Sequence, residues 1–271
     1  MKVTKFPNKI SLGERTMILG SFYTFHNGHK ILFDIAKSYK NKIIAMLIND
    51  LSILKKASKQ QYESLEIRLQ HMANIGIDEV VVVEFDSNIM GMSGKQFAQK
   101  LKEKYNVLRF VVGKDFAMGK NANYKAIDLQ KDFNTIIVKL LKINEKKLST
   151  SLLCEFVTFG NVEQVKKNSP FFFTLDARIK SDGIFEINGL TPHTGIYAAW
   201  AIVNSVKYWA TVRISKTKVH EIIVPELLLK NTGYDAQIEF VNSIRIVIKR
   251  EFDIIKPNDL EKTVEYLKKH L

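Results

Sequence analysis

The chain has 271 residues, 46% of them hydrophobic, which is enough to build one large core or two smaller ones. Its single cysteine excludes an intramolecular disulfide, and no stretch approaches the ~20 apolar residues that a membrane span needs. The net charge of +13 comes from lysines spread along the whole chain, without a run of five basic residues, so it is weak evidence for nucleic-acid binding. The polar first residues do not resemble a signal peptide, and with the lone thiol they indicate a cytoplasmic protein.

The first half of the chain alternates short apolar runs with amphipathic stretches, which is typical of βαβ units in a parallel sheet. In such sheets ligands bind beyond the carboxyl ends of the strands, so the loops after the strands are the expected site. We expect strands at residues 16–20, 42–49, 79–85, 107–113 and 134–139, and helices at 28–39, 62–75, 93–104 and about 149–156.

The second half of the chain changes to strands and turns, with almost no helix until Pro257. This pattern predicts a small antiparallel barrel or sandwich followed by a C-terminal helix. We therefore expect an α/β chain of two domains: a Rossmann-like parallel-sheet domain over residues 1–168 and an antiparallel β-barrel domain over residues 169–271. The expected strands are 171–179, 184–187, 195–203, 206–213, 218–224 and 236–250, with turns at 181–183, 188–189 and 231–233.

The most informative segment is the loop between the first predicted strand and the first predicted helix, residues 20–29. His26 and His29 are three residues apart at the start of the helix, so both can face one ligand. The free N–H groups of a helix N-terminus favour a phosphate, and Gly28 lets the backbone approach it closely. Two imidazoles and free amides suit an anion that gains charge during reaction, such as the α-phosphate of ATP under attack.

Two other interpretations of the histidine pair stay open at this point. One is structural, with one buried histidine bonded to the backbone and the other exposed. The other is a zinc site, which lacks a third ligand because Cys154 has no companion motif. The strand before the loop and the helix after it favour the nucleotide, and the tetrad at 26–29 resembles the HxGH signature of the adenylyl-transferring α/β nucleotidyltransferases.

A second loop, residues 113–119, follows the fourth predicted strand at the same edge of the sheet. Gly113 and Gly119 enclose an acid and an aromatic residue, which suits a flat ring lying against Phe116 with Asp115 bonded to its polar edge. For this loop alone, an ordinary strand exit with Phe116 in the core is the favoured interpretation.

In their order along residues 14–168, the motifs resemble those of the prokaryotic bifunctional riboflavin kinase/FMN adenylyltransferases, the FAD synthetases. Matching positions are the histidine loop, Arg68 on the next helix, Phe85-Asp86, Ser93 with Phe97, the loop 113–119 and the turn 149–151. The resemblance implies transfer of the adenylyl group of ATP to FMN, with Mg²⁺ accompanying ATP and with FMN and ATP as the partners of this chain. It implies His26 and His29 as catalytic residues, Gly20, Phe22, Gly28, Ser149, Thr150 and Ser151 as ATP-binding residues, and Gly113, Asp115, Phe116 and Gly119 as flavin-binding residues.

The chain departs from the family pattern at two places that concern phosphate binding. Tyr23 stands where the family usually has an acid, and Leu152 and Leu153 stand where arginines usually follow the Ser/Thr turn. Lysines could replace the arginines as point charges, at the loss of bidentate geometry. We expect adenylyl transfer to be retained and leave open whether it is weakened. The candidate lysines are Lys120, Lys146 and Lys147.

The second half resembles the family's riboflavin kinase module more faintly, through residues 192–198, Ile244-Arg245, 250–252 and 259–260. Its Gly-Phe-Pro-Thr-Ala-Asn motif is missing, so we expect a degenerate kinase. Glu221 is the nearest candidate for the kinase base, although a surface glutamate on a barrel strand is an equal alternative.

Other functions stay open beside FMN adenylyl transfer. The kinase activity could survive in a form that the motifs do not reveal. Another adenylyl- or cytidylyltransferase could use the same histidine loop on nicotinate mononucleotide, phosphopantetheine or glycerol phosphate. The lost arginines also suit a non-catalytic flavin- or nucleotide-binding protein. The sequence leaves the oligomeric state undefined.

Overall fold

The structure is a computed structural model that describes residues 1–8, 13–49, 60–143, 145–187, 189–217, 219–227, 233–246 and 254–270. The chain divides into two compact units, which are described separately below. The first unit comprises Met1–Lys59 and Arg68–Ser149, and the second comprises Gln60–Ile67 and Thr150–Leu271. The boundary at residue 168 between the two expected domains stays a prediction. By contacts, the helices just before it group with the second unit.

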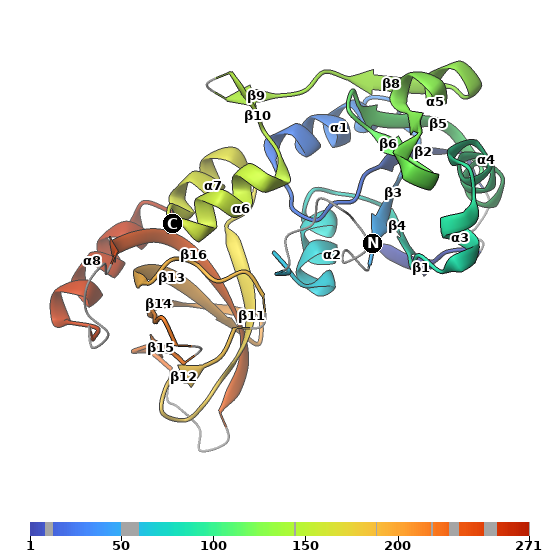
Figure 1. Cartoon of the computed structure of the whole chain (residues 1–271). Helices are drawn as coiled ribbons and strands as arrows, with labels where there is room; N and C mark the ends of the chain where they lie inside the picture. Colours follow the sequence, from blue (N-terminus) through green and yellow to red (C-terminus); the bar gives the residue numbers. More distant parts are fainter. Residues whose placement is uncertain are drawn as a thin grey trace. The chain divides into compact units, whose positions relative to one another are not determined.

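A six-stranded, fully parallel sheet forms the centre of the first unit (Figure 1). Its central strands are continuous apolar runs, as expected for a sheet covered on both faces. All five residues of β2 and all five of β4 are buried. The strand order is β1 (Lys2–Lys5), β4 (Glu79–Val83), β3 (Lys42–Ile48), β2 (Arg15–Leu19), β5 (Val107–Gly113) and β8 (Thr135–Val138).

A buried ion pair joins two strands that flank β3 at the amino end of this sheet. Arg15 Nε lies 2.5 Å from Glu79 Oε2, and both side chains are almost fully buried. The same guanidinium donates to the Gly13 carbonyl at 2.6 Å. Both charges are therefore paired and hydrogen-bonded, as burial of charge requires.

Helices connect the strands, and side chains satisfy the N-termini of several of them. His26 caps α1, Asp86 caps α3, and Ser93 forms a capping box with Gln96 at α4. Two small hairpins complete the unit, β6 (Ala117–Met118) with β7 (Tyr124–Lys125) and β9 (Lys142–Ile143) with β10 (Lys146–Lys147). The helices are α1 (Asn27–Lys37), α2 (Leu65–Asn74), α3 (Ser87–Gly91), α4 (Gly94–Tyr105) and α5 (Ala126–Asp132), with a 3₁₀ turn at Lys120–Ala122.

The second unit carries a six-stranded antiparallel sheet and two helices ahead of it, α6 (Thr150–Thr158) and α7 (Val162–Asn168) (Figure 1). The Lys180 N–H donates to the Ile184 carbonyl at 2.8 Å and so links the two edge strands of the sheet. Its core is aromatic, with Phe240 packed 5.7 Å from Phe173 and 5.6 Å from Tyr197 between ring centroids. The strand order is β11 (Phe173–Ile179), β16 (Tyr234–Ile246), β13 (Gly195–Val203), β14 (Val206–Ile214), β15 (His220–Ile223) and β12 (Ile184–Phe185).

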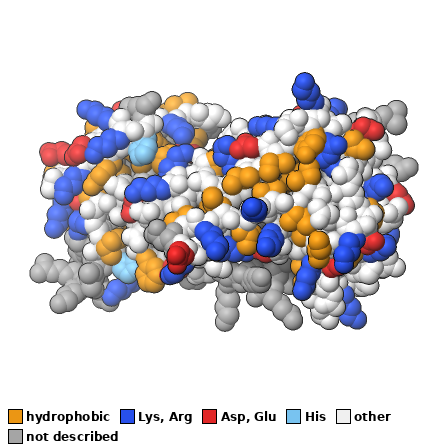
Figure 2. Space-filling model, turned by 90° about the horizontal axis from the view of Figure 1, so that it is seen from above, with side chains coloured by type: hydrophobic (Ala, Val, Ile, Leu, Met, Phe, Trp, Pro, Cys, Tyr) orange, Lys and Arg blue, Asp and Glu red, His pale blue; other side chains and the backbone are white. Residues whose placement is uncertain are grey.

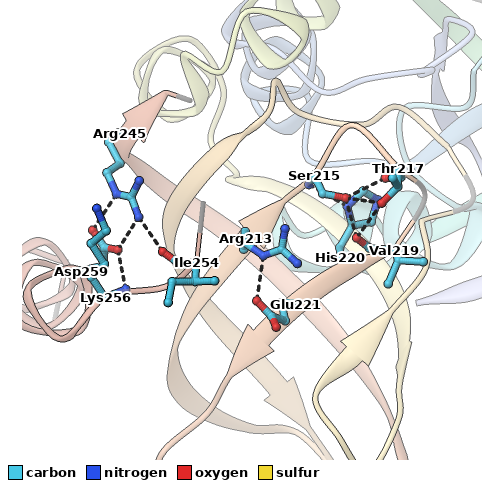
Figure 3. Close-up of polar contacts among 10 residues, drawn as sticks. All are labelled: Arg213, Ser215, Thr217, Val219, His220, Glu221, Arg245, Ile254, Lys256 and Asp259. Atoms are coloured by element: carbon cyan, nitrogen blue, oxygen red, sulfur yellow. Dashed lines mark hydrogen bonds and ion pairs between the residues drawn. The ribbon is translucent and has the colours of Figure 1, made fainter. Parts of the chain in front are cut away.

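The C-terminal helix α8 (Pro257–Lys268) covers the outer face of this sheet and buries Leu267 against Trp200 and Val241. Arg245 at the end of β16 attaches the helix by two hydrogen bonds to Asp259, at 3.0 and 2.9 Å (Figure 3). The Lys256 N–H adds a third hydrogen bond to the same carboxylate at 2.8 Å. The side-chain hydroxyls of Thr211 and Thr263 meet at 2.7 Å further along the helix.

The predicted fold class is confirmed: a parallel Rossmann-like sheet is followed by an antiparallel sheet and a C-terminal helix. All eleven predicted strands are present with small shifts of their ends. The helices and strands that the sequence did not predict are short or exposed. They are β1, α3, α5, α7 and the two small hairpins. Residues 188, 218, 231–232 and 247–250, which carry parts of the predicted turns and strands, lie outside the described residues, as do residues 250–252 of the fainter resemblance.

Loss of the Asp259 carboxylate is expected to destabilise the second unit in a pH-dependent way. Burial alone would raise the pKa of Asp259, but the bonds from Arg245 and Lys256 outweigh it and hold that pKa below its usual value. The native state therefore binds this proton more weakly than the unfolded chain, so the stabilisation exists above the unfolded pKa of ~3.9 and is lost as pH falls through the native one. Asp259→Asn should lower the free energy of unfolding by about 1.5–3 kcal/mol at pH 7, and by less at pH 3, in urea titrations.

Glu265→Gln is the matched control, because it removes a carboxylate of the same helix that forms only an exposed pair with Lys269. A loss in Asp259→Asn no larger than in this control, or a loss that is the same at both pH values, would contradict the assignment.

Candidate active site

The histidine loop leaves the carboxyl end of β2 and enters α1, where the two imidazoles stack on each other. Their ring centroids are 3.8 Å apart with an angle of 15° between the planes. His26 is the N-cap residue of α1, and its Nδ1 accepts a hydrogen bond from the His29 N–H at 3.3 Å. The structure therefore brings the two predicted catalytic residues together at the positive end of a helix dipole.

Gly28 is explained by this stack. A Cβ at position 28 would lie 2.9 Å from His26 Nδ1 and 3.0 Å from its Cε1. Any side chain there would push the His26 ring away from its place over His29. The space beside Gly28, where the sequence predicted the close approach of a phosphate, is therefore occupied by the His26 ring in this structure.

Both histidines are neutral near pH 7. Burial, followed by the Lys147 charge, lowers the pKa of His26 to about 4, although Asp115 opposes this. Burial and the neighbouring His26 hold the pKa of His29 well below its usual value, against a backbone hydrogen bond with Thr24. The Nδ1 atom of His29 is buried and has no hydrogen-bond partner among the residues that the structure describes. A neutral imidazole carries one N–H donor. Because Nδ1 of His26 accepts from the His29 N–H, the other ring nitrogen of His26 carries the proton and can donate to an oxygen that becomes more negative.

Buried aromatic rings pack against the histidine pair. The Phe22 ring is fully buried, stacks on Phe25 at 5.6 Å and lies 5.1 Å from the His29 ring. Phe22 has a positive φ of 45°, and a Cβ at Gly20 would lie 3.0 Å from its ring. The predicted ATP contacts of Phe22 and Gly20 would accordingly come from their backbone, because the Phe22 side chain belongs to the core.

Arg68, matched to the family's basic residue, is also fully buried. Its guanidinium donates to the carbonyls of Ile48 at 2.9 Å and Asn49 at 3.4 Å. This places Arg68 at the end of β3, where it holds backbone carbonyls beside the histidine loop.

The loop 113–119 begins at the end of β5 with a turn in which the Phe116 N–H donates to the Gly113 carbonyl at 2.9 Å. Phe116 is half-buried, so the core interpretation of its ring holds only in part. Gly119 has a φ of 77°, and a Cβ there would lie 2.7 Å from the Gly94 Cα, so close packing on the start of α4 explains this glycine. Asp115 is exposed and forms an ion pair with Lys147.

The β9–β10 hairpin brings the charge of Lys147, one of the lysines that the sequence offered in place of the missing arginines, near the histidine pair. The ion pair of Lys147 with Asp115 was not predicted. The Leu148 N–H donates to the Leu141 carbonyl at 2.9 Å, and Leu141 lies beside Gly28. His26, Asp115 and Lys147, from three separate loops of the first unit, therefore form one cluster. Ser149 is the last residue of this unit, and Thr150 and Ser151 begin α6 in the second unit.

The candidate kinase base, Glu221, is engaged in an ion pair. Its carboxylate accepts from Arg213 Nε at 2.7 Å across the β14–β15 ladder (Figure 3). The preceding residue, His220, is buried, accepts a hydrogen bond from the Ser215 N–H at 3.2 Å, and has its pKa lowered to about 4 by burial and by Arg213. This geometry fits the alternative of a structural glutamate on a barrel strand.

The described residues hold no group of three His, Cys, Asp or Glu side chains that could bind a metal ion. Burial raises the pKa of the Cys154 thiol to about 12, so this cysteine is a poor ligand and nucleophile. Across the described ranges, every helix is too short or too polar to cross a membrane. On the face drawn in Figure 2, lysine and arginine side chains are scattered among apolar and acidic ones.

Comparison with known proteins gives consistent results. The chain is 25% identical to the bifunctional riboflavin kinase/FMN adenylyltransferase of Listeria monocytogenes over 269 aligned residues, 87% of this chain and 85% of that protein. The enzyme of the same name from Bacillus subtilis is 29% identical over 217 residues, 71% of this chain and 69% of that protein. A crystal structure titled macrolide-efflux protein, from Streptococcus pneumoniae, covers 90% of this chain with a TM-score of 0.78 and 18% identity, which shows a shared fold.

The family model for FAD synthetase matches residues 9–152, more than half of the chain and the whole histidine site described above. The chain therefore belongs to the FAD synthetase family.

Proposed function

We propose that this protein is an FMN adenylyltransferase, which converts FMN and ATP to FAD and pyrophosphate. The observation that carries the proposal is the stacked, neutral histidine pair at the N-terminus of α1 in a chain of the FAD synthetase family. A site that only bound nucleotide would not need two buried imidazoles where charge develops.

In the proposed reaction an FMN phosphate oxygen attacks the α-phosphorus of ATP in line, and the bond to pyrophosphate breaks. No covalent enzyme intermediate is needed, because FMN itself is the nucleophile. His26 and His29 donate hydrogen bonds to oxygens of the α-phosphate and of the leaving pyrophosphate, together with the first N–H groups of α1. Magnesium enters as part of the MgATP substrate and keeps mostly phosphate and water ligands.

The flavin would lie near the loop 113–119, with Phe116 as the aromatic surface and Gly113 giving room for close approach. Gly20 and Phe22 would contact ATP through the backbone. For Ser149, Thr150 and Ser151, the family motif alone supports contacts with ATP through their hydroxyls. These assignments rest on the family motifs and on the positions of the two loops at the carboxyl edge of the sheet.

Riboflavin kinase activity is the second candidate, favoured by the names of the relatives that align with most of this chain. Against it stands Glu221, which is held by Arg213 rather than available as a base. We therefore infer an adenylyltransferase whose antiparallel domain lacks kinase activity.

Incubation with ATP and Mg²⁺, once with FMN and once with riboflavin, separates these functions when the flavins are resolved by chromatography. The proposal expects FAD from FMN and none from riboflavin. FAD from both would show that the kinase is active, and no FAD from either would refute the adenylyltransferase.

His29→Ala is expected to lower kcat by ~10²–10³-fold with a modest change in KM for ATP, because this donor acts mainly on the transition state. Steady-state rates of FAD formation measure both constants. His270→Gln, at an exposed position two residues after the end of α8, is the control and should match the unaltered protein. An unchanged kcat in His29→Ala would remove His29 from the mechanism.

The histidine pair should also titrate far below an ordinary histidine. NMR of the free protein, with His26 assigned through His26→Gln, is expected to give a midpoint of about 4 for the His26 ring. Since the unfolded chain binds this proton near ~6.5, the free energy of unfolding should fall as pH drops from that value towards 4. A midpoint near 6.5 would show that the His26 ring is not buried as described.

A further inference from the structure

The chain lacks the arginines that would follow the Ser/Thr turn, so its phosphate site needs another cation. We propose that Lys147 binds the polyphosphate of ATP beside His26. Before ATP binds, Asp115 holds the Lys147 ammonium in place, and the polyphosphate then displaces the Asp115 carboxylate. This inference rests on the proposed function and assigns two residues within the same site.

The hairpin geometry distinguishes Lys147 from its neighbour Lys146, the other candidate lysine on β10. Lys147 forms the ion pair with Asp115, and its charge acts on both His26 and His29. Lys146 precedes it on β10, and successive strand residues point to opposite faces. Lys146 forms no ion pair within the part of the chain that the structure describes. It carries the same charge as Lys147 but on the opposite face of the strand.

Exchange of partners at Lys147 is energetically easy. The side chains of Lys147 and Asp115 are 41% and 45% exposed, and ion pairs of that exposure contribute about 0–1 kcal/mol. A triphosphate carries several negative charges and can therefore replace one carboxylate. Before it arrives, Asp115 keeps a flexible lysine side chain within reach of the histidines, so Asp115 is a positioning residue.

The pair also filters ligands by charge. A ligand with one phosphate brings less negative charge to Lys147 than pyrophosphate or ATP, and so it displaces the Asp115 carboxylate less readily. The site in the free protein should accordingly prefer polyphosphates to monophosphates.

Calorimetric binding of MgATP to the full chain tests the proposal without requiring turnover. Lys147→Met should weaken binding by about tenfold, the loss expected for one charge-assisted phosphate contact. Lys147→Arg should restore most of the affinity, and Lys146→Met, which removes the same charge one residue away, should leave it within about twofold at equal ionic strength. Equal affinities of Lys147→Met and Lys146→Met would overturn the proposal.

Asp115→Asn tests the positioning residue through a double-mutant cycle. The single variant should change MgATP affinity, and that change should vanish in the Lys147→Met background, because Asp115 acts through Lys147. NMR provides a second readout: Lys147→Met should raise the His26 midpoint and Asp115→Asn should lower it. Additive effects of the two substitutions on affinity would show that Asp115 does not act through Lys147.

The same variants separate this inference from the function on which it rests. If they bind MgATP as expected but the unaltered protein makes no FAD, the adenylyltransferase proposal fails and the role of Lys147 stands. If FAD forms and Lys147→Met binds MgATP like Lys146→Met, the role of Lys147 fails and the adenylyltransferase stands.

Discussion

The stacking of His26 on His29 at the start of α1 is the interaction on which the whole site depends. It combines a helix cap, a glycine that leaves room for one ring, and a floor of buried aromatic residues. Burial keeps both imidazoles neutral, so the helix N-terminus carries only its own partial positive charge until a substrate arrives. Fixed donors of this kind stabilise developing charge without the reorganisation that water would need.

The sheet explains why the loops meet at this point. Parallel strands end at one edge, so β2 delivers the histidines and β5 delivers Asp115 to the same side. The β9–β10 hairpin adds Lys147 after β8, the strand next to β5. Charge in this cluster is balanced in the free protein by the Asp115–Lys147 pair, which gives the site a cation that a ligand can take over.

Much of this architecture could be predicted from the sequence, because buried parallel strands are apolar runs and amphipathic helices have a clear period. The strand at 107–113 is found with the predicted bounds. By contrast, β1 is a mostly exposed edge strand with two lysines among its four residues, so it has no apolar signal. The five-residue helix α3 and the two-residue strands of the hairpins are too short to show a period.

The histidine loop was recognisable from the spacing of its two histidines. The ion pair that lies near these histidines in the structure was not recognisable. Asp115 and Lys147 are separated by 32 residues, and nothing local to either one indicates the other. Gly28 likewise suggested space for a phosphate, and only the side-chain packing shows the His26 ring there. Glu221 illustrates the same limit in the second unit, since its pairing with Arg213 depends on the register of β14 and β15.

Exchange of radiolabelled pyrophosphate into ATP tests the central claim, direct attack by FMN at the histidine site, most directly. Protein, MgATP and labelled pyrophosphate are incubated with and without flavin, and the label in ATP is counted. Direct transfer predicts that label enters ATP only when FMN or FAD is present, because the reverse step needs FAD as the adenylyl donor. Label in ATP without any flavin would reveal an adenylyl-enzyme, and no label under either condition would contradict adenylyl transfer to flavin.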